Sequence, residues 1–342
     1  QAPTISSQTG NSTVCEGQPM SFNVIASGTS PITYQWYKDN TPISGATNYL
    51  LNFTSTTTAD VADYYCQVSN TCGTVQTYAS SLAVRVAPSI TSQSGNEVRC
   101  EDQSVTFSIT SAGSSPVTYQ WYKNGTAIAN ATNTTHTISV VKPGDATNYY
   151  CTATNSCGSA FSSPVVLTVN TKPEVVTSFD SATLCTGDNI ILNVTATGAS
   201  PITYQWYHHL TKIKDATNSS HLLSSVNAAS EGRYSCEVTN VCGTTNSDYV
   251  NVAINEPVKI LDASSDAEVC EGSEATFELN VTGESPITYQ WFNSNNIELV
   301  GETTYTLHFS NAQLNDADEY YCEVTNSCGP VRSVMMELVV HE

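Results

Sequence analysis

The sequence has few positive charges and no long apolar run. Lys and Arg together number 11 against 31 Asp and Glu, which gives a formal net charge of −20. Phosphate groups are bound by clustered Lys and Arg, so this balance argues against nucleic acid and anionic membrane surfaces as partners. No apolar stretch reaches the roughly 18–20 residues that a membrane-spanning helix needs. We therefore expect no nucleic-acid partner and no membrane span.

Helical periodicity and the motifs of catalysis are also missing. Charged residues make up only 12% of the chain, while Ser, Thr, Asn and Tyr are abundant, a composition that suits many short strands. The chain contains no glycine-rich phosphate loop, no HExxH and no GxSxG. None of its six histidines accompanies a motif with a catalytic nucleophile. We expect an all-β protein that is not an enzyme and that binds neither a cofactor nor a metal.

What the chain does have is cysteine, in a pattern of three that recurs four times. The first cysteines of successive patterns are 85 residues apart, and four tryptophans keep the same step: Trp36, Trp121, Trp206 and Trp291. A unit of this length falls within the usual domain range of roughly 50–250 residues. The repeat predicts four domains, at residues 1–86, 87–171, 172–256 and 257–342. Regular cysteines without metal-site spacing also indicate an oxidising, extracellular compartment.

The first repeat has the pattern of a series of short strands. Apolar and polar residues alternate over residues 20–24 and 32–36, with turn residues between them. Asn70-Thr71-Cys72-Gly73 is typical of a hairpin turn, because glycine suits a left-handed backbone position. We expect the last strand to carry Tyr78 and Leu82. Seven or more such strands indicate an antiparallel sandwich.

Three segments of each repeat resemble the immunoglobulin superfamily. In the first repeat they are Gln35-Trp36-Tyr37-Lys38, residues 60–66 and residues 70–73. The resemblance implies four tandem immunoglobulin-like antiparallel β-sandwiches in a head-to-tail array. It also implies that the four tryptophans are core residues of strand C, and that each domain has a tyrosine corner, at Tyr64, Tyr149, Tyr234 and Tyr320.

The repeats depart from the family at strand B. The inward position that holds a cysteine in the family is occupied here by Val24, Ile109, Val194 and Leu279. The early cysteine instead precedes Glu16-Gly17, where the family places the turn between strands A′ and B. A Cys-Glu-Gly start combined with an Asn-x-Cys-Gly turn resembles the repeats of secreted adhesins and surface filaments of gliding bacteria. This resemblance implies a structural array in a secreted or surface-attached bacterial adhesin stalk or filament.

The family's geometry favours disulfides between neighbouring domains. In such a sandwich the A′–B and F–G turns lie at opposite ends of a domain about 40 Å long, whereas a disulfide needs Cα atoms within about 7 Å. We expect bonds between Cys15 and Cys157, Cys100 and Cys242, and Cys185 and Cys328, with Cys72 and Cys270 bonded to units beyond the two ends. The remaining cysteines would be buried core thiols: Cys66, Cys151, Cys236 and Cys322.

Two other arrangements of the thiols are open at this point. Cys15 could bond to Cys66 inside the domain, which would leave the turn cysteine free or bonded to another chain, and the cysteines could instead bind a metal. We expect the partners to be neighbouring repeats, further filament chains and an unknown surface ligand. The sequence start has no signal-peptide features, so we expect a mature segment of a longer array.

The alternative function is recognition of a ligand. The chain would then be a module of a secreted or cell-surface receptor that binds sugar or protein through variable upper loops, around residues 28–30 and 130–133. A spacer predicts that the repeats are interchangeable, whereas a receptor predicts that one repeat dominates.

Overall fold

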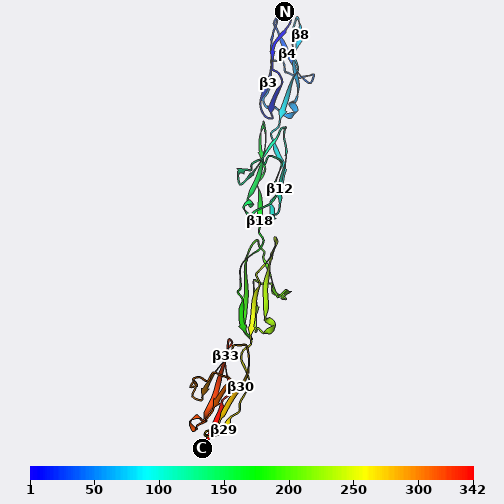
Figure 1. The fold of residues 1–342 in the computed structure, drawn as a ribbon. Coiled ribbons are helices and arrows are strands. Elements are labelled where there is room, and N and C mark those ends of the chain that lie inside the picture. The colour runs from blue at the N-terminus through cyan, green and yellow to red at the C-terminus, as the bar shows by residue number, and fades with distance from the viewer. The chain divides into compact units, whose positions relative to one another are not determined.

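Alternating apolar residues build two facing β-sheets in each repeat of the chain. The structure is a computed structural model that describes residues 1–342. Figure 1 shows four β-sandwiches that follow one another along the chain, and we number these domains one to four. The expected all-β fold of four tandem sandwiches is confirmed. The exact boundaries between domains stay a prediction.

The first two domains have the same order of elements. The first contains β1 (Thr4–Gln8), β2 (Ser12–Cys15), β3 (Met20–Ser27), β4 (Thr33–Lys38), β5 (Thr41–Pro42), β6 (Leu50–Phe53), the short helix η1 (Thr58–Asp60), β7 (Ala62–Asn70), β8 (Gly73–Gln76) and β9 (Ser80–Arg85). The second contains β10 (Ser89–Gln93), β11 (Glu97–Cys100), β12 (Val105–Ala112), β13 (Thr118–Lys123), β14 (Thr126–Ala127), β15 (Thr135–Ile138), η2 (Pro143–Asp145), β16 (Asn148–Asn155), β17 (Gly158–Phe161) and β18 (Val165–Asn170).

The other two domains repeat this order with one strand fewer in the last. The third contains β19 (Glu174–Ser178), β20 (Ala182–Cys185), β21 (Ile190–Thr197), β22 (Thr203–His208), β23 (Thr211–Lys212), β24 (Ser220–Leu223), η3 (Ala228–Ser230), β25 (Gly232–Asn240), β26 (Gly243–Asn246) and β27 (Val250–Asn255). The fourth contains β28 (Lys259–Ala263), β29 (Ala267–Cys270), β30 (Ala275–Thr282), β31 (Thr288–Asn293), β32 (Thr306–Phe309), η4 (Leu314–Asp316), β33 (Asp318–Asn326), β34 (Gly329–Arg332) and β35 (Met336–His341).

In the first domain the two sheets share the opening segment of the chain. The smaller sheet has the order β1-β3-β6, and the larger has the order β2-β9-β7-β4-β5 with β8 paired to β7. Strand β1 runs antiparallel to β3, after which the chain crosses to the other sheet, where β2 runs parallel to β9. The parallel pair is an addition to the antiparallel pattern expected from the sequence. It fixes Cys15 on the edge strand of the larger sheet, opposite Arg85. We call the end of each domain that holds the turn after this cysteine its lower end, and the end that holds the turn between β7 and β8, or its equivalent, the upper end.

The core of each domain is built around its tryptophan. Trp36 is 3% exposed and its indole N–H donates to the Asn48 carbonyl at 2.9 Å. Phe22, Val24 and Cys66 pack in the same cluster. The apolar residue of the strand B position is buried in every domain, as are all four tryptophans. Burial of these side chains supplies the main driving force for folding each sandwich.

Each domain also closes its lower end with a tyrosine hydroxyl. Tyr64 donates to the carbonyl of Asp60, four residues earlier, at 2.8 Å. The same bond recurs from Tyr149 to Asp145, from Tyr234 to Ser230 and from Tyr320 to Asp316, at 3.0, 2.9 and 2.7 Å. Each bond connects the strand that contains the tyrosine (β7, β16, β25 or β33) to the short helix before it, which is the geometry of a tyrosine corner.

One residue expected in the last strand lies elsewhere. Tyr78 is 86% exposed, because the pairing of β8 ends at Gln76 and β9 begins only at Ser80. The side chain of Gln8 holds the backbone between the two strands: its amide nitrogen donates to the Tyr78 carbonyl, and its oxygen accepts from the Tyr78 N–H. The tyrosine therefore points into solvent rather than into the core.

The chain divides into two compact units of two domains each. They are Gln1–Asn170 and Thr171–Glu342. None of the helices has the length and apolar character needed to cross a bilayer.

Candidate functional site

The lower end of the first domain presents Cys15 on a well-fixed turn. The side-chain hydroxyl of Thr56, which is fully buried, donates to the Cys15 and Gln18 carbonyls at 3.2 and 2.9 Å. Gly17 turns the chain with a φ of +81° and donates its N–H to the Thr56 carbonyl at 2.7 Å. Cys15 is half-buried at the end of this turn.

The upper end of the second domain presents Cys157 on a hairpin turn. Strands β16 and β17 pair up to Asn155 and Gly158, so the two residues between them form the tip. The Cys157 N–H donates to the Asn155 side-chain oxygen at 2.8 Å. This bond orients the cysteine in the Asn-x-Cys-Gly turn, as expected for a short polar side chain beside a turn amide.

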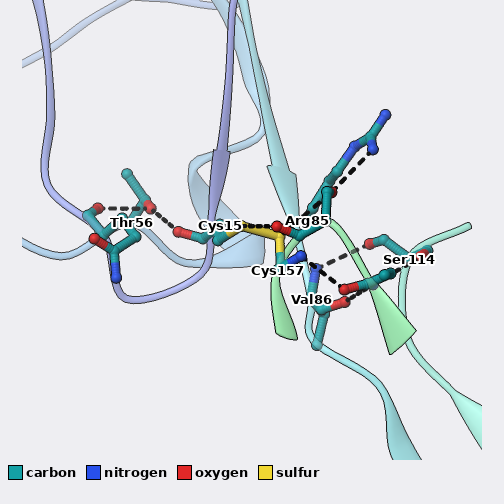
Figure 2. Close-up of a disulfide and its surroundings, with 9 residues drawn as sticks. Cys15, Thr56, Arg85, Val86, Ser114 and Cys157 are labelled. Atoms are coloured by element: carbon teal, nitrogen blue, oxygen red, sulfur yellow. Dashed lines mark hydrogen bonds between the residues drawn. A yellow bond between two sulfur atoms is a disulfide. The ribbon is translucent and has the colours of Figure 1, made fainter. Parts of the chain in front are cut away.

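The two cysteines form a disulfide that joins the domains of the first unit. Their Cα atoms are 5.5 Å apart and the S–S distance is 1.99 Å (Figure 2). Arg85 lies opposite Cys15 on the next strand, and its guanidinium donates to the Ser156 hydroxyl at 3.2 Å. The bridge and this hydrogen bond connect the lower turn of one domain to the upper turn of the next.

The linker between these domains is held by the same hairpin. The Asn155 amide nitrogen donates to the carbonyls of Val86 and Ser114 at 2.8 and 2.9 Å. Val86 and Ser114 also bond each other, through the Val86 N–H to the Ser114 hydroxyl and the Ser114 N–H to the Val86 carbonyl (Figure 2). Asn155 therefore orients Cys157 with one end of its side chain and fixes the linker with the other.

The second unit contains the same junction with different side chains. Cys185 and Cys328 form a disulfide with a Cα–Cα distance of 5.6 Å. Asn255 replaces arginine and donates to the Ser327 hydroxyl at 2.8 Å. Asn326 makes the same bonds as Asn155. Its amide nitrogen donates to the Glu256 and Glu284 carbonyls, and its side-chain oxygen accepts from the Cys328 N–H.

Four further cysteines lie at the turns at the ends of the domains, and their expected bonds are of two kinds. Cys72 at the upper turn of the first domain and Cys270 at the lower turn of the fourth are exposed free thiols. Their expected bonds to further units stay a prediction. The expected pair of Cys100 and Cys242 would join the two units, and it also stays a prediction.

The third cysteine of each repeat lies in the core. Cys66, Cys151, Cys236 and Cys322 are free, and each is fully buried. Burial raises the pKa of the Cys66 thiol to about 11, and the other three are raised to the same value for the same reason. Cys15 bonds Cys157 in the structure, so the alternative bridge from Cys15 to Cys66 is not the arrangement seen.

Of the loops expected to vary, the counterparts of residues 28–30 in the other three domains contact the linkers, whereas residues 130–133 bond within their own domain. Ser114 belongs to the loop between β12 and β13, and it bonds the linker at Val86. The corresponding loop of the third domain bonds Thr171, and that of the fourth bonds Glu256. The sequence did not reveal this use of the loops, because the contacts join residues far apart in the chain. No three His, Cys, Asp or Glu side chains within residues 1–342 come together as a metal site.

The disulfides shorten the covalent path through each unit. In the first unit the ends are connected through residues 1–15 and 157–170, which is 29 of 170 residues. Fully extended, this path reaches about 100 Å, against about 600 Å for the whole unit without the bridge. Two sandwiches of about 40 Å each already span most of the shorter path. Unfolding the domains would therefore lengthen the bridged unit very little.

Comparison with known proteins identifies the domain type. The immunoglobulin domain profile matches residues 2–70, 87–155 and 172–240, and the immunoglobulin I-set profile matches residues 258–340. Hemicentin-2 of Mus musculus is 27% identical over 96% of the chain, and neuroglian of Drosophila melanogaster is 25% identical over 90%. The chain spans only 7% and 26% of these two relatives. A titin I-band fragment, I67–I69, shares the fold, with a TM-score of 0.62 and 20% identity over 74% of the chain and 99% of the fragment.

Proposed function

The chain belongs to the immunoglobulin domain family, and we propose that it is a tension-bearing structural array of an extracellular adhesin stalk or surface filament. The proposal rests on the two junction disulfides, Cys15–Cys157 and Cys185–Cys328. Each connects neighbouring domains, and neither stabilises the core of a single domain. This pattern of disulfides limits how far the chain can be extended, and it leaves the domain cores without covalent cross-links.

The proposal includes the third bridge and the continuation of the array. Cys100 and Cys242 occupy the same lower and upper turns as the bonded pairs, so we assign them to a bridge between the second and third domains. Cys72 and Cys270 are exposed at these same two turns, which suits bonding to further units of the same type. The domain boundaries that go with this wiring are 1–86, 87–171, 172–256 and 257–342.

We place the array on a bacterial surface because of its local motifs. In the first junction the Cys-Glu-Gly start carries Cys15 and the Asn-x-Cys-Gly turn carries Cys157, and in the second the start is Cys185-Thr186-Gly187. These motifs resemble the repeats of gliding-bacterial adhesins, whereas the animal relatives share the domain type at 27% identity or less. Labelling of intact and permeabilised cells of the source organism with an antibody to the array tests this placement, and signal confined to permeabilised cells would contradict it.

Pulling the full chain by its ends in a force spectrometer tests the mechanical function. With the two junction bridges intact, the path is residues 1–15, 157–185 and 328–342, or 59 of 342 residues. This path extends to about 200 Å, whereas the reduced chain extends to about 1,200 Å, roughly six-fold further. Equal contour lengths for the oxidised and reduced chains would contradict the proposal.

A matched variant reports on the third bridge in the same experiment. Serine at Cys15, Cys157, Cys185 and Cys328 removes the two junction bridges and leaves Cys100 and Cys242 in place. If that pair is bonded, the path becomes residues 1–100 and 242–342, about 700 Å when extended. A length of about 1,200 Å would show that the third bridge is absent. Cys66→Ala is the control, since it removes a cysteine that lies outside every bridge.

A further inference from the structure

One face of the third domain lacks an aromatic stack that the other three domains have. In these domains two rings stack across neighbouring strands of the larger sheet: Tyr37 on Tyr65, Tyr122 on Tyr150 and Phe292 on Tyr321. Their centroids are 4.8, 4.8 and 5.2 Å apart and their planes differ by 11° or less. At the same register of the third domain, Tyr207 lies opposite Ser235.

The missing ring leaves a shallow cavity beside Tyr207. The cavity has a volume of about 200 Å³, and Tyr207, Ser235, Glu237, Asn246 and Tyr249 line it together with the residues after β22. Tyr249 is 57% exposed, so it adds a second ring at the rim. The cavity is close in size to one sugar ring. An aromatic face without a stacking partner is a favourable surface for a flat ligand.

The polar groups of this cavity are free to bind a ligand. Ser235 is 8% exposed, and no hydrogen bond of its hydroxyl to another protein group occurs in residues 1–342. The Glu237 carboxylate and the Asn246 amide likewise have no side-chain hydrogen bond or ion pair within the described chain. The matching groups of the fourth domain, Glu323 and Arg332, are paired with each other at 3.2 Å.

We propose that this cavity of the third domain binds a neutral sugar, with one pyranose ring stacked on Tyr207. A pyranose presents a flat patch of C–H groups for the aromatic ring and hydroxyl groups for Ser235, Glu237 and Asn246. An aromatic peptide side chain would leave these polar groups unpaired, at a cost of about 1–3 kcal/mol each. The net charge of −20 and the Glu237 carboxylate disfavour an anionic sugar. The Lys212 ammonium lies over one face of the Tyr207 ring, with its Nζ 5.9 Å from the centroid, and adds a hydrogen-bond donor at the site.

Saturation-transfer NMR on the full chain tests the site directly. The probes are the methyl glycosides of glucose, galactose, mannose and N-acetylglucosamine, with sialic acid as the anionic comparison. We expect at least one neutral glycoside to receive saturation at its ring protons and sialic acid to receive none. Absence of signal from all four glycosides would overturn the proposal, and so would a signal from sialic acid alone.

Substitutions locate the binding on the third domain. Ser235→Tyr rebuilds the stacked pair that the other domains already contain, so it should fill the cavity without unfolding the sandwich and weaken binding about tenfold or more. Tyr207→Ala removes the stacking ring and should have a similar effect. The matched control is Tyr37→Ala, which removes the equivalent ring of the first domain, lies outside the proposed site and should leave the signal unchanged. Wild-type binding by Ser235→Tyr would overturn the assignment, and a near-ultraviolet dichroism spectrum confirms that each variant is folded.

Discussion

The cysteine in each domain core is a buried thiol, whereas the cysteines at the domain ends within each unit form disulfides between neighbours. Cys66 is fully buried beside Trp36 and Phe22, in a core that apolar packing already stabilises. Cys15 and Cys157 lie half-buried on two turns, beside the hydrogen bond from Arg85 to Ser156. A disulfide thus joins cysteines on partly exposed turns and is absent from the fully buried core.

The comparison explains why the family's core bridge can be dispensed with. Val24 occupies the strand B position at 1% exposure and fills the space a second sulfur would take. A junction hydrogen bond such as that from Arg85 to Ser156 contributes only about 0.5–1.5 kcal/mol. Bonds of this size yield under tension, so the disulfide, and not the hydrogen bonds, keeps the two turns together when the chain is pulled.

Thiol alkylation should give the largest contrast between the two regions. At pH 8 we expect N-ethylmaleimide to modify the exposed Cys72 and Cys270 at least 10³-fold faster than the four core thiols, because these react only when a domain opens at a cost of about 5–15 kcal/mol. The measurement is mass spectrometry of peptides from freshly purified monomer. Similar rates for both classes would show that the cores open readily, and urea should abolish the difference as an internal control.

Removing a core tryptophan should have the next largest effect. Trp36→Ala deletes a side chain that is 3% exposed, and we expect the first domain to lose about 3–5 kcal/mol of its free energy of unfolding. Equilibrium urea unfolding of the full chain measures this loss, with the alkylation rate of Cys66 reporting on the first domain. Cys236, in the third domain, is the matched control and should keep its wild-type rate. An equal increase in the alkylation rates of Cys66 and Cys236 would contradict the expectation that each domain core unfolds independently.

Much of this arrangement can be predicted from the repeat in the sequence. The 85-residue step of Trp36 and its equivalents predicts the domains, and the absence of a strand B cysteine predicts the thiol cores. The corner tyrosines lie where the resemblance implies, because they depend on contacts only four residues away. Local patterns are enough for such features.

Hydrogen bonds between distant residues could not be predicted in the same way. Asn155 bonds residues 69 and 41 positions earlier, so its role in holding the linker depends on how two domains meet. The exposed position of Tyr78 depends on where pairing of the last strand stops. The cavity beside Tyr207 did leave a signal, since aligning the repeats sets Ser235 against Tyr65, Tyr150 and Tyr321. That signal has meaning only once the rings are known to stack.

Alkaline pH should destabilise the cores through their thiols. The pKa of Cys66 rises from 9.0 to about 11 on folding, so the folded state retains a proton that the unfolded state loses between these values. Stability is fully present below pH 9 and falls as the pH rises to about 11, by on the order of 1 kcal/mol per pH unit for each thiol. Urea midpoints at pH 8 and pH 10.5, with Cys72 and Cys270 blocked, measure the effect.

The control for this effect is a variant in which all four core cysteines are alanine. It should lose less stability over the same pH interval, and what it still loses comes from the corner tyrosines, since burial raises the pKa of Tyr64 and Tyr320 to about 12. An identical pH dependence in the variant and the wild type would show that the thiols do not titrate with unfolding.

Replacing the asparagine that bonds both the bridge cysteine and the linker should give the smallest effect. We expect this effect only at the junction that contains the asparagine. Asn155→Ala removes the acceptor for the Cys157 N–H and both donors to the linker, so we expect the Cys15–Cys157 disulfide to become about tenfold easier to reduce, or roughly 1–2 kcal/mol. Equilibration with glutathione buffers, followed by peptide mass spectrometry, measures this ratio. Asn326→Ala should act in the same way on Cys185–Cys328 alone. A change at both bridges from either substitution would mean that the junctions are not independent, because each asparagine contacts only its own linker.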